Sequence, residues 1–325
     1  MPRVTRGFAR SFGIAFVFAG VFAFLPRERV EIGSLPEIGD PVAFLEAREG
    51  AFGDIRAGGA ARIVWAGQEG AVTPLSVVYL HGFSAGPEEI RPVPDRVAEA
   101  LGANLVYARL AGHGRSGDAM AEARAGDWVA DTALFLEIGR RVGERVLVIG
   151  TSTGGTLAAW AMSDAAMAVD VAGVVLVSPN FAVENRAGFL LEQPFARQWV
   201  PWVAGAERRF EPLNAGQAAH WTTRYPTVAT VSLGTLLREM RGRDLGAAGQ
   251  PVLVLFADSD QVVSAPATRA AMARWGGAVT LAPVSLPEMG ADPFHHVIAG
   301  DILSPGMTDE VVVRILDWAG DALAE

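Results

Sequence analysis

The stretch that most constrains the fold covers residues 145–156, which read Arg-Val-Leu-Val-Ile-Gly-Thr-Ser-Thr-Gly-Gly-Thr. Its apolar, β-branched run at 146–149 is typical of a buried strand, and the apolar residues after Thr156 recur at helical spacing. Between strand and helix stands the pattern G-x-S-x-G, with Ser152 at its centre. This pattern predicts a tight strand-to-helix turn that holds a reactive serine. An ordinary glycine- and serine-rich turn is the alternative interpretation.

The glycines of this turn have a physical reason. Because glycine lacks a Cβ, a glycine on either side of Ser152 lets the backbone turn tightly. The start of the following helix would then offer free backbone N–H groups and a partial positive charge to a developing oxyanion. Ser152 is therefore the candidate nucleophile.

Composition bounds the kind of site that the chain can hold. The 325 residues are enough for one large α/β domain with an insertion, or for two small domains. The net charge is −9, the basic residues are all arginine, and they form no cluster in the body of the chain, so nucleic acid is not an expected partner. The absence of cysteine excludes disulfides, thiolate metal sites and a cysteine nucleophile. No metal or cofactor is implied.

Residues 1–29 predict a signal anchor or a signal peptide. Three arginines come first, and residues 11–25 then form an uncharged, mostly apolar run that ends at Pro26. The run is short for a membrane-spanning helix, which needs about 20 residues. We favour an uncleaved single-pass anchor in the cell membrane; a cleaved signal peptide and a buried helix are the alternatives. The arginine excess predicts a cytosolic N-terminus and a main body outside the cytoplasm, either anchored or exported to the periplasm or beyond.

Buried strands alternate with helices through most of the remaining chain. This alternation predicts an α/β fold with a mostly parallel, doubly wound sheet. The predicted domain organisation is a first core part at 30–179, a helical cap at 180–249 and a second core part at 250–325. The predicted strands are 62–65, 75–80, 104–110, 146–149, 173–177, 251–257 and 278–284, and the predicted helices are 41–48, 93–101, 127–142, 266–275 and 308–322, the last with Thr308 as its N-cap.

A serine hydroxyl needs a base, and the base needs a carboxylate to orient it. In a site of this type the acid and then the histidine follow the serine along the chain. Asp258 and Asp260 follow the strand at 251–257, and His295 and His296 follow the strand at 278–284. Parallel sheets place their sites at these strand ends. The spacing alone leaves both members of each pair open.

Five motifs occur in order along the chain. Together they resemble those of the α/β-hydrolase superfamily, in the branch of monoacylglycerol lipases, lysophospholipases, carboxylesterases and serine aminopeptidase (S33)-like proteins. The resemblance covers roughly residues 70–325 apart from the predicted cap. The motifs are His81-Gly82-Phe83, Gly112-His113-Gly114-Arg115-Ser116, the G-T-S-T-G turn, Asp258-Ser-Asp260-Gln-Val262-Val263 and His296-Val297.

The resemblance implies a serine hydrolase that cleaves carboxylic esters through an acyl-enzyme intermediate. Ser152 then matches the nucleophile, Asp260 the acid of a D-x-V-V motif, and His296 the base that precedes a valine. The backbone N–H groups of Phe83 and Thr153 would form the oxyanion hole. Asp258 would cap a turn and His295 would be a packing neighbour.

One motif also fits a different function. Residues 112–117 match G-x-G-x-x-G, the dinucleotide-binding pattern, and follow a predicted strand. However, residues 118–126 show no apolar helix, and no second strand ends in an acid about 20 residues on. The hydrolase interpretation of these residues explains more.

The predicted cap indicates what kind of ester might bind. It is rich in aromatic residues, which would cover Ser152 and line an acyl pocket, or would form the core of the cap itself. With an anchor nearby, lipid-like or other apolar acyl esters are the expected substrates. The alternatives are an amidase or aminopeptidase whose acidic pocket uses Glu184, Glu192 and Glu207, an acyltransferase, and a non-catalytic binding protein of the same fold.

Overall fold

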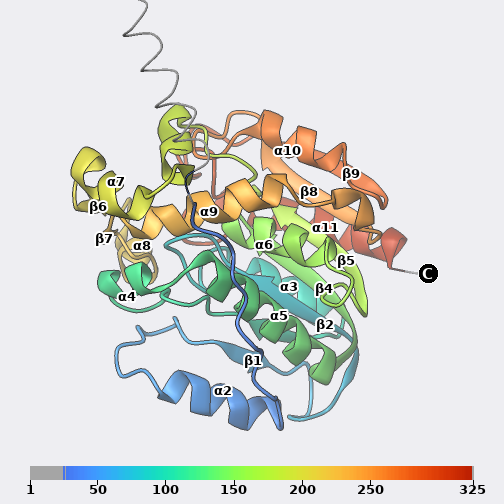
Figure 1. Cartoon of the computed structure of the whole chain (residues 1–325). Coiled ribbons are helices and arrows are strands. Elements are labelled where there is room, and N and C mark those ends of the chain that lie inside the picture. The colour runs from blue at the N-terminus through green and yellow to red at the C-terminus, as the bar shows by residue number, and fades with distance from the viewer. Residues whose placement is uncertain (1–24, 26, 324–325) are drawn as a thin grey trace, which may run out of the picture.

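The computed structural model describes residue 25 and residues 27–323 (Figure 1). The predicted signal or anchor segment therefore lies almost entirely outside the described residues. Within the described part of the chain, none of the helices is both long and apolar enough to cross a membrane.

A seven-stranded sheet forms the centre of the molecule, in the order β1-β3-β2-β4-β5-β8-β9. β1 pairs with β3 in antiparallel orientation, and all the other neighbours in this sheet are parallel. The predicted mostly parallel α/β sheet is confirmed. Its strands are β1 (Arg62–Val64), β2 (Thr73–Leu80), β3 (Asn104–Tyr107), β4 (Gly143–Thr151), β5 (Val171–Val177), β8 (Val252–Ala257) and β9 (Val279–Val284).

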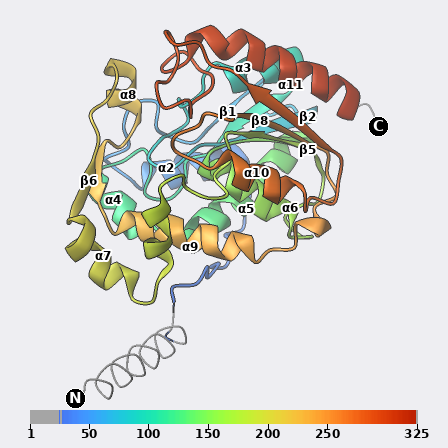
Figure 2. The same ribbon diagram turned by 90° about the horizontal axis from the view of Figure 1, so that it is seen from above.

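Helices cover both faces of this sheet. Side chains that point to one face, such as Val148 and Val254, join a core with α5, α6 and α10, while Ile149 and Leu255 join a core with α3 and α11. Figure 2 shows these two helical layers with the sheet between them. The helices are α3 (Val93–Ala100), α5 (Ala125–Val142), α6 (Thr153–Met162), α10 (Ala265–Met272) and α11 (Thr308–Ala322).

The expected N-cap of the last helix is wrong in detail. α11 begins at Thr308 itself, and Met307 occupies the cap position. The Thr308 hydroxyl accepts a hydrogen bond from the Gly300 N–H at 3.0 Å instead of capping the helix. This bond attaches the loop after His296 to the start of α11.

A buried ion network fixes the loop that follows β3. It begins on α2 (Pro41–Gly50), where Glu49 binds Arg109 at 2.5 Å and Arg48 binds Asp131 of α5 at 2.7 Å. The other Asp131 oxygen accepts the Ala111 N–H at 2.6 Å. Because Arg109 is only 1% exposed, the network anchors this loop from inside the protein.

The segment from residue 180 to residue 249 leaves the sheet after β5 and returns at β8. It is mainly helical, but it also contains an antiparallel two-stranded ribbon that was not predicted from the sequence. Figures 1 and 2 both place α7, α8 and this ribbon together, on the side of the molecule opposite the C-terminal end of α11. Its elements are η1 (Arg186–Glu192), α7 (Ala196–Ala204), β6 (Glu207–Arg209), α8 (Ala215–His220), β7 (Arg224–Pro226), α9 (Ala229–Arg241) and η2 (Leu245–Ala247).

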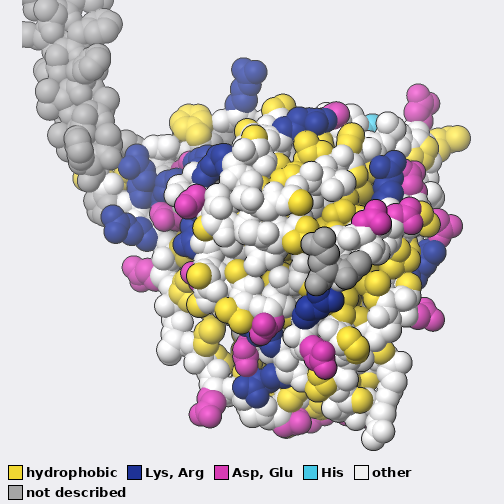
Figure 3. Space-filling model, turned by 90° about the vertical axis from the view of Figure 1, so that its right-hand side faces the viewer, with side chains coloured by type: hydrophobic (Ala, Val, Ile, Leu, Met, Phe, Trp, Pro, Cys, Tyr) yellow, Lys and Arg dark blue, Asp and Glu magenta, His cyan; other side chains and the backbone are white. Residues whose placement is uncertain are grey.

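The opposite side of the molecule carries an edge of the sheet. β9 is the last strand, and its Val279 and Leu281 are 36% and 38% exposed. Figure 3 shows hydrophobic side chains on this face interspersed with charged ones of both signs. Charged side chains beside an exposed edge strand discourage pairing with another chain.

Candidate active site

Ser152 lies at the tip of the turn between β4 and α6, with φ 52° and ψ −115°. This strained conformation needs glycine on both sides. A Cβ at Gly154 would lie 2.0 Å from the carbonyl oxygen of Leu80, and one at Gly150 would lie 2.5 Å from the carbonyl oxygen of Gly154. The G-x-S-x-G pattern is therefore required by backbone contacts, and the turn lifts the serine above the end of the sheet.

A continuous chain of hydrogen bonds runs from this serine. Ser152 Oγ lies 3.0 Å from His296 Nε2, and His296 Nδ1 lies 2.8 Å from Asp260 Oδ2. A carboxylate accepts only, so Nδ1 carries the proton and Nε2 is free to accept from the serine hydroxyl. All three residues are buried, with exposed fractions of 6%, 9% and 8% for Ser152, His296 and Asp260.

The two neighbours that the spacing left open have other partners. Asp258 forms an ion pair with Arg269 at 2.8 Å, and His295 Nδ1 lies 2.7 Å from Ser259 Oγ. Neither side chain belongs to the hydrogen-bonded chain from Ser152. The structure therefore brings together the members of each pair that the family motifs indicated.

Burial and charge act in opposite directions on His296. Burial alone would lower the pKa of the imidazole. The hydrogen bond and charge of Asp260, with the charges of Glu89 and Asp292, outweigh burial and raise the pKa of His296 above its usual value. The site therefore stabilises the imidazolium that forms when the histidine takes a proton.

Thr153 and Phe83, whose N–H groups are expected in the oxyanion hole, belong to two segments that meet at Ser152. Thr153 is the first residue of α6, so its N–H has no acceptor within the helix. Phe83 lies in the loop after β2, where a Cβ on the preceding Gly82 would be 3.1 Å from Ser152 Cβ. The Phe83 ring packs edge-on against Tyr225, with the ring centroids 5.5 Å apart. This contact holds the loop under the segment that covers it.

Comparison with known proteins decides the family. The model of a hydrolase family described as serine aminopeptidase, S33, matches residues 75–282. The chain belongs to this family. The S33 match begins within β2, includes the serine turn and Asp260, and ends within β9, before His296.

One curated relative of this S33 chain and two of the solved structures similar to it are described as lipolytic enzymes. A thermostable monoacylglycerol lipase from Bacillus sp. (strain H-257) is 25% identical over 190 residues, which are 58% of this chain and 72% of the relative. Among solved structures, one from LipS and LipT, two metagenome-derived lipolytic enzymes, has a TM-score of 0.64 at 19% identity and covers 82% of this chain and 99% of its own. The monoacylglycerol lipase of Paleococcus ferrophilus has a TM-score of 0.57 at 13% identity, and the match covers 81% of this chain and 98% of the lipase. These structures show the α/β-hydrolase fold.

The S33 chain attaches its 180–249 segment to both loops of the site. Val183 forms an antiparallel bridge with Val263, three residues after Asp260. The Asn214 side chain donates to the carbonyl oxygen of Ile302, in the loop that follows His296, at 2.6 Å. The segment therefore connects the loop of the acid with the loop of the base.

The aromatic residues of this segment divide into two groups. Some are buried against the core, such as Trp221 and Tyr225 at 5% and 8% exposure. Others lie at the surface, and Trp202 is 89% exposed. Trp221 belongs to the core that includes α3 and α11, and Tyr225 packs with Met120 of α4, so these two aromatics attach the segment to the body of the protein.

Two buried carboxylates near the site were not found from the sequence. Asp292 Oδ2 accepts the N–H groups of His296 and Val297 at 3.0 and 2.9 Å, and so fixes the histidine loop. Glu89 lies beneath the loop of Phe83 and is 3% exposed. The only sequence signal for Asp292 is an acid four residues before the histidine.

The alternative dinucleotide motif is explained by the fold. A short helix, α4 (Gly117–Glu122), follows the glycine pattern, but it packs mainly against β7 and α9. His113, inside the pattern, is buried, and its Nδ1 lies 3.0 Å from the Ala111 carbonyl oxygen. The glycines therefore shape a loop beside the site and do not open a phosphate-binding helix.

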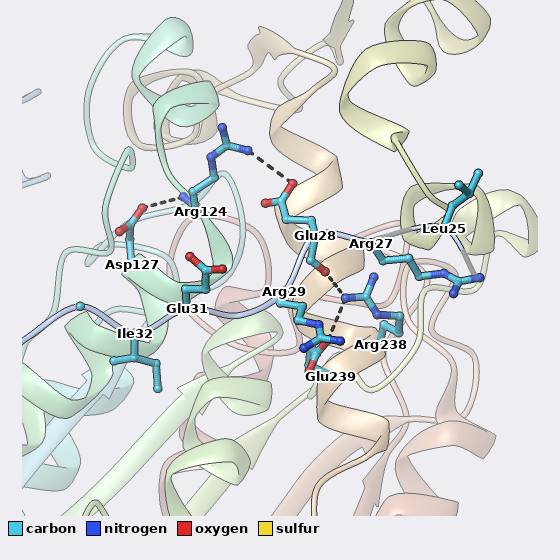
Figure 4. A pocket seen from close by; sticks show the side chains of 11 residues that line it. Leu25, Arg27, Glu28, Arg29, Glu31, Ile32, Arg124, Asp127, Arg238 and Glu239 are labelled. Atoms are coloured by element: carbon cyan, nitrogen blue, oxygen red, sulfur yellow. Dashed lines mark hydrogen bonds and ion pairs between the residues drawn. The ribbon is translucent and has the colours of Figure 1, made fainter. Parts of the chain in front are cut away.

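A hollow of about 1190 Å³ lies elsewhere on the molecule, between the segment at 27–33, α5 and α9. Figure 4 shows Arg124 and Arg238 approaching Glu28 from two sides, with dashed lines to its carboxylate and its carbonyl oxygen. None of Ser152, Asp260 and His296 lines this hollow. It is separate from the candidate active site.

Proposed function

We propose that the chain is a serine hydrolase that cleaves carboxylic esters, with Ser152, His296 and Asp260 as its catalytic residues. The observation that carries the proposal is the hydrogen-bonded chain of 3.0 and 2.8 Å from Ser152 through His296 to Asp260. This is the geometry that activates a serine hydroxyl for attack on an acyl group.

The reaction follows from these positions. Ser152 Oγ attacks the ester carbonyl while His296 Nε2 takes its proton, and the resulting imidazolium is stabilised by Asp260. The carbon–oxygen bond to the alcohol then breaks, and His296 protonates the departing alcohol. Water, deprotonated by His296, attacks the acyl-enzyme and releases the acid and the free serine.

In this proposal, the oxyanion of each tetrahedral intermediate accepts hydrogen bonds from the Phe83 and Thr153 N–H groups. Such donors contribute about 3 kcal/mol each to the transition state in related enzymes. The N-terminus of α6 adds its partial positive charge behind Thr153. The strained turn at Ser152 and the close approach of Gly82 to Ser152 support this arrangement.

Apolar acyl esters, including lipid-like ones, are the substrates that we favour. The similarity to a monoacylglycerol lipase supports this choice. Membrane attachment through residues 1–29 and a location outside the cytoplasm stay predictions, since residues 1–24 and 26 lie outside the described part of the chain.

An aminopeptidase is the second candidate, since the family description names that activity. It would need free carboxylates to bind a substrate amine. Glu192 is paired with Arg241 and Glu207 with Arg224, and Glu184 is exposed in the loop before η1. These residues do not form a shared acidic pocket, so we place ester hydrolysis first.

The test uses the full-length chain with nitrophenyl esters from acetate to palmitate, beside an aminoacyl nitroanilide. We expect ester turnover that Ser152→Ala abolishes and that Ser163→Ala, a change at the far end of α6, leaves intact. A fluorophosphonate probe should label the unmodified protein at Ser152 and should not label the Ser152→Ala variant. If the protein shows no ester turnover and is not labelled by the probe, the non-catalytic binding protein is favoured. Ester transfer to an added alcohol in place of hydrolysis would indicate the acyltransferase.

A further inference from the structure

A carboxylate that this mechanism does not use lies under the loop that follows β2. Glu89 is 3% exposed and belongs to the connection between β2 and α3. Its Oε2 accepts the Gly82 N–H at 2.7 Å and the Tyr79 hydroxyl at 3.0 Å. The Tyr79 hydroxyl also lies 3.2 Å from Thr151 Oγ1, at the end of β4. A buried chain of hydrogen bonds therefore joins the loop after β2 to the residue before the nucleophile.

Gly82 is held closely between this carboxylate and the nucleophile. A Cβ at Gly82 would lie 2.6 Å from Glu89 Oε1 and 3.1 Å from Ser152 Cβ. The position therefore admits no side chain, and any displacement of the Glu89 carboxylate changes the space directly beside the serine.

The hydrogen bonds of Gly82 also decide the direction of the Phe83 N–H. That N–H belongs to the same rigid peptide unit as the Gly82 carbonyl. His81 Nδ1 and the Ala85 N–H bind this carbonyl at 2.9 and 3.3 Å, and Glu89 holds the N–H on the other side of the same residue. Because both the N–H and the carbonyl of Gly82 are hydrogen-bonded, the Phe83 N–H is held in a single orientation.

Glu89 and His296 also affect one another through charge. Burial raises the pKa of Glu89 to about 7, although the Gly82 N–H, the positive charge of His296 and the Tyr79 hydroxyl act against this. The negative charge of Glu89 in turn supports protonation of His296, together with the charges of Asp260 and Asp292. These three carboxylates are the acidic groups that act on the imidazole.

We propose that Glu89 is a positioning residue of the active site. Its carboxylate holds the Gly82–Phe83 peptide in the orientation that serves the oxyanion. It also adds a third carboxylate, after Asp260 and Asp292, close to Ser152 and its partner His296. The inference rests on the proposed function, since it assigns Glu89 a part in the reaction of Ser152. Glu89 forms no bond to the substrate and transfers no proton.

Three substitutions separate positioning from packing. Glu89→Ala removes both hydrogen bonds and the charge, Glu89→Gln keeps an oxygen for both bonds but removes the charge, and Tyr79→Phe removes one bond only. Glu88→Gln is the matched control, because the neighbouring carboxylate binds Arg62 and Arg91 away from the serine. Each full-length variant would be assayed for kcat and KM, for the rate of fluorophosphonate labelling, and for thermal unfolding.

We expect Glu89→Ala to lower kcat about 100-fold with KM changed less than about threefold, since only transition-state contacts are lost. Glu89→Gln should restore kcat to within about fivefold of the unmodified protein. In the Gln variant the acid limb of kcat/KM should move to lower pH by no more than about half a unit, because the Glu89 charge near His296 is missing and that charge is only partly present around the Glu89 pKa of about 7. Tyr79→Phe should lower kcat by less than Glu89→Ala, and Glu88→Gln should change nothing.

The inference is overturned if Glu89→Ala keeps the labelling rate and kcat of the unmodified protein. It is also overturned if the Ala and Gln variants lose activity equally and the acid limb stays in place, since that is the result of lost packing. If Glu89→Ala does not fold, the Gln and Tyr79→Phe variants decide by the same criteria. Failure of the unmodified protein to label at Ser152 would overturn the proposed function and this inference with it; labelling that is insensitive to Glu89 would overturn only the inference.

Discussion

Two aspartates stand two residues apart after β8, and they have different partners. Asp260 Oδ2 binds His296 Nδ1, and Asp260 Oδ1 accepts the N–H groups of Val262 and Val263 at 2.7 and 2.9 Å. The carboxylate is therefore held by its own loop and cannot turn away from the imidazole. Asp258 is bound to Arg269 at the surface. This difference allows a direct test of the proposed acid.

Asp260→Asn should lower kcat about 10⁴-fold, because the amide favours the wrong imidazole tautomer and does not stabilise the imidazolium. Asp258→Asn is the matched control and should leave kcat within about twofold, as surface ion pairs contribute little. In the proposed mechanism His296 acts as a base in its neutral form, so kcat/KM should fall as the pH falls through the pKa of His296. Asp260 raises that pKa, so the acid limb of any residual activity should move to lower pH in Asp260→Asn. Equal losses in the two variants would remove Asp260 from the mechanism.

The sequence predicted some single residues and not others, for a physical reason. Ser152 is visible because its turn needs glycines at fixed spacing, and the spacing then reduced the acid and the base to two candidates each. Glu89 and Asp292 were not visible, because their contacts are made by loops whose paths depend on the folded sheet. In a loop the apolar residues do not recur at regular spacing, so the sequence does not distinguish a carboxylate that will be buried from one that will be solvated.

At the scale of elements, the turn from β4 to α6 is limited by backbone contacts. A Cβ at Gly154 would lie 2.0 Å from the Leu80 carbonyl oxygen and 2.8 Å from that of His81. These atoms belong to β2 and the start of the next loop, so neither can move alone. By contrast, Gly320 in α11 is exposed and has no atom within 4 Å of a Cβ placed on it.

Gly154→Ala should therefore lower the free energy of unfolding by about 3 kcal/mol and reduce ester turnover, since β2 or the turn must shift. Gly320→Ala should raise the free energy of unfolding by about 0.5–1 kcal/mol, because alanine favours a helix interior. Urea denaturation midpoints of both variants, taken with the slope of each transition, would measure this. If the Gly154→Ala protein is as stable as the unmodified one, the backbone atoms of Leu80 and His81 do not exclude a side chain at position 154.

The long apolar elements were predictable and the short polar ones were not. The buried runs of β2, β4, β5 and β8 have six or more residues in their strands, and each was placed from its β-branched composition. β6 and β7 have three residues each, and all of β6 is exposed. Such strands have no apolar alternation, so the ribbon that they form was missed. The antiparallel pairing of β1 depends on the path of the chain across the sheet and not on its three residues.

At the scale of the whole molecule, two buried histidines couple stability to pH. His81 and His113 lie in the loops after β2 and β3, and both are about 1% exposed or less. Burial is the main reason that the pKa of His81 falls to about 3 and that of His113 to about 4. In the folded protein both rings are therefore neutral above about pH 5, and their hydrogen bonds hold the neutral form in place.

The sign of the effect follows from proton binding. An unfolded histidine titrates near a pKa of about 6.5. Between about pH 6.5 and pH 4 the unfolded chain binds protons at both positions and the native protein does not, so their contribution to stability is lost as the pH falls. Glu89 acts in the opposite direction: with its pKa raised to about 7, the native protein binds a proton that the unfolded chain releases near pH 4.5. Its contribution to stability therefore grows as the pH falls from about 7 to about 4.5.

His113→Gln isolates one of these protons. The substitution removes a group that is neutral in the fold and protonated in the unfolded chain, so the slope of unfolding free energy against pH between about 4.5 and 6 should fall by about 1.4 kcal/mol per pH unit. His220→Gln, at the C-terminal end of α8, is the control for loss of a histidine outside the buried loops. Urea denaturation at half-unit steps from pH 4.5 to 7.5 would give both slopes. If the slopes of the His113→Gln and unmodified proteins agree, the His113 ring must already be protonated in the native state or solvated in it, and the buried neutral histidine is the wrong description of this loop.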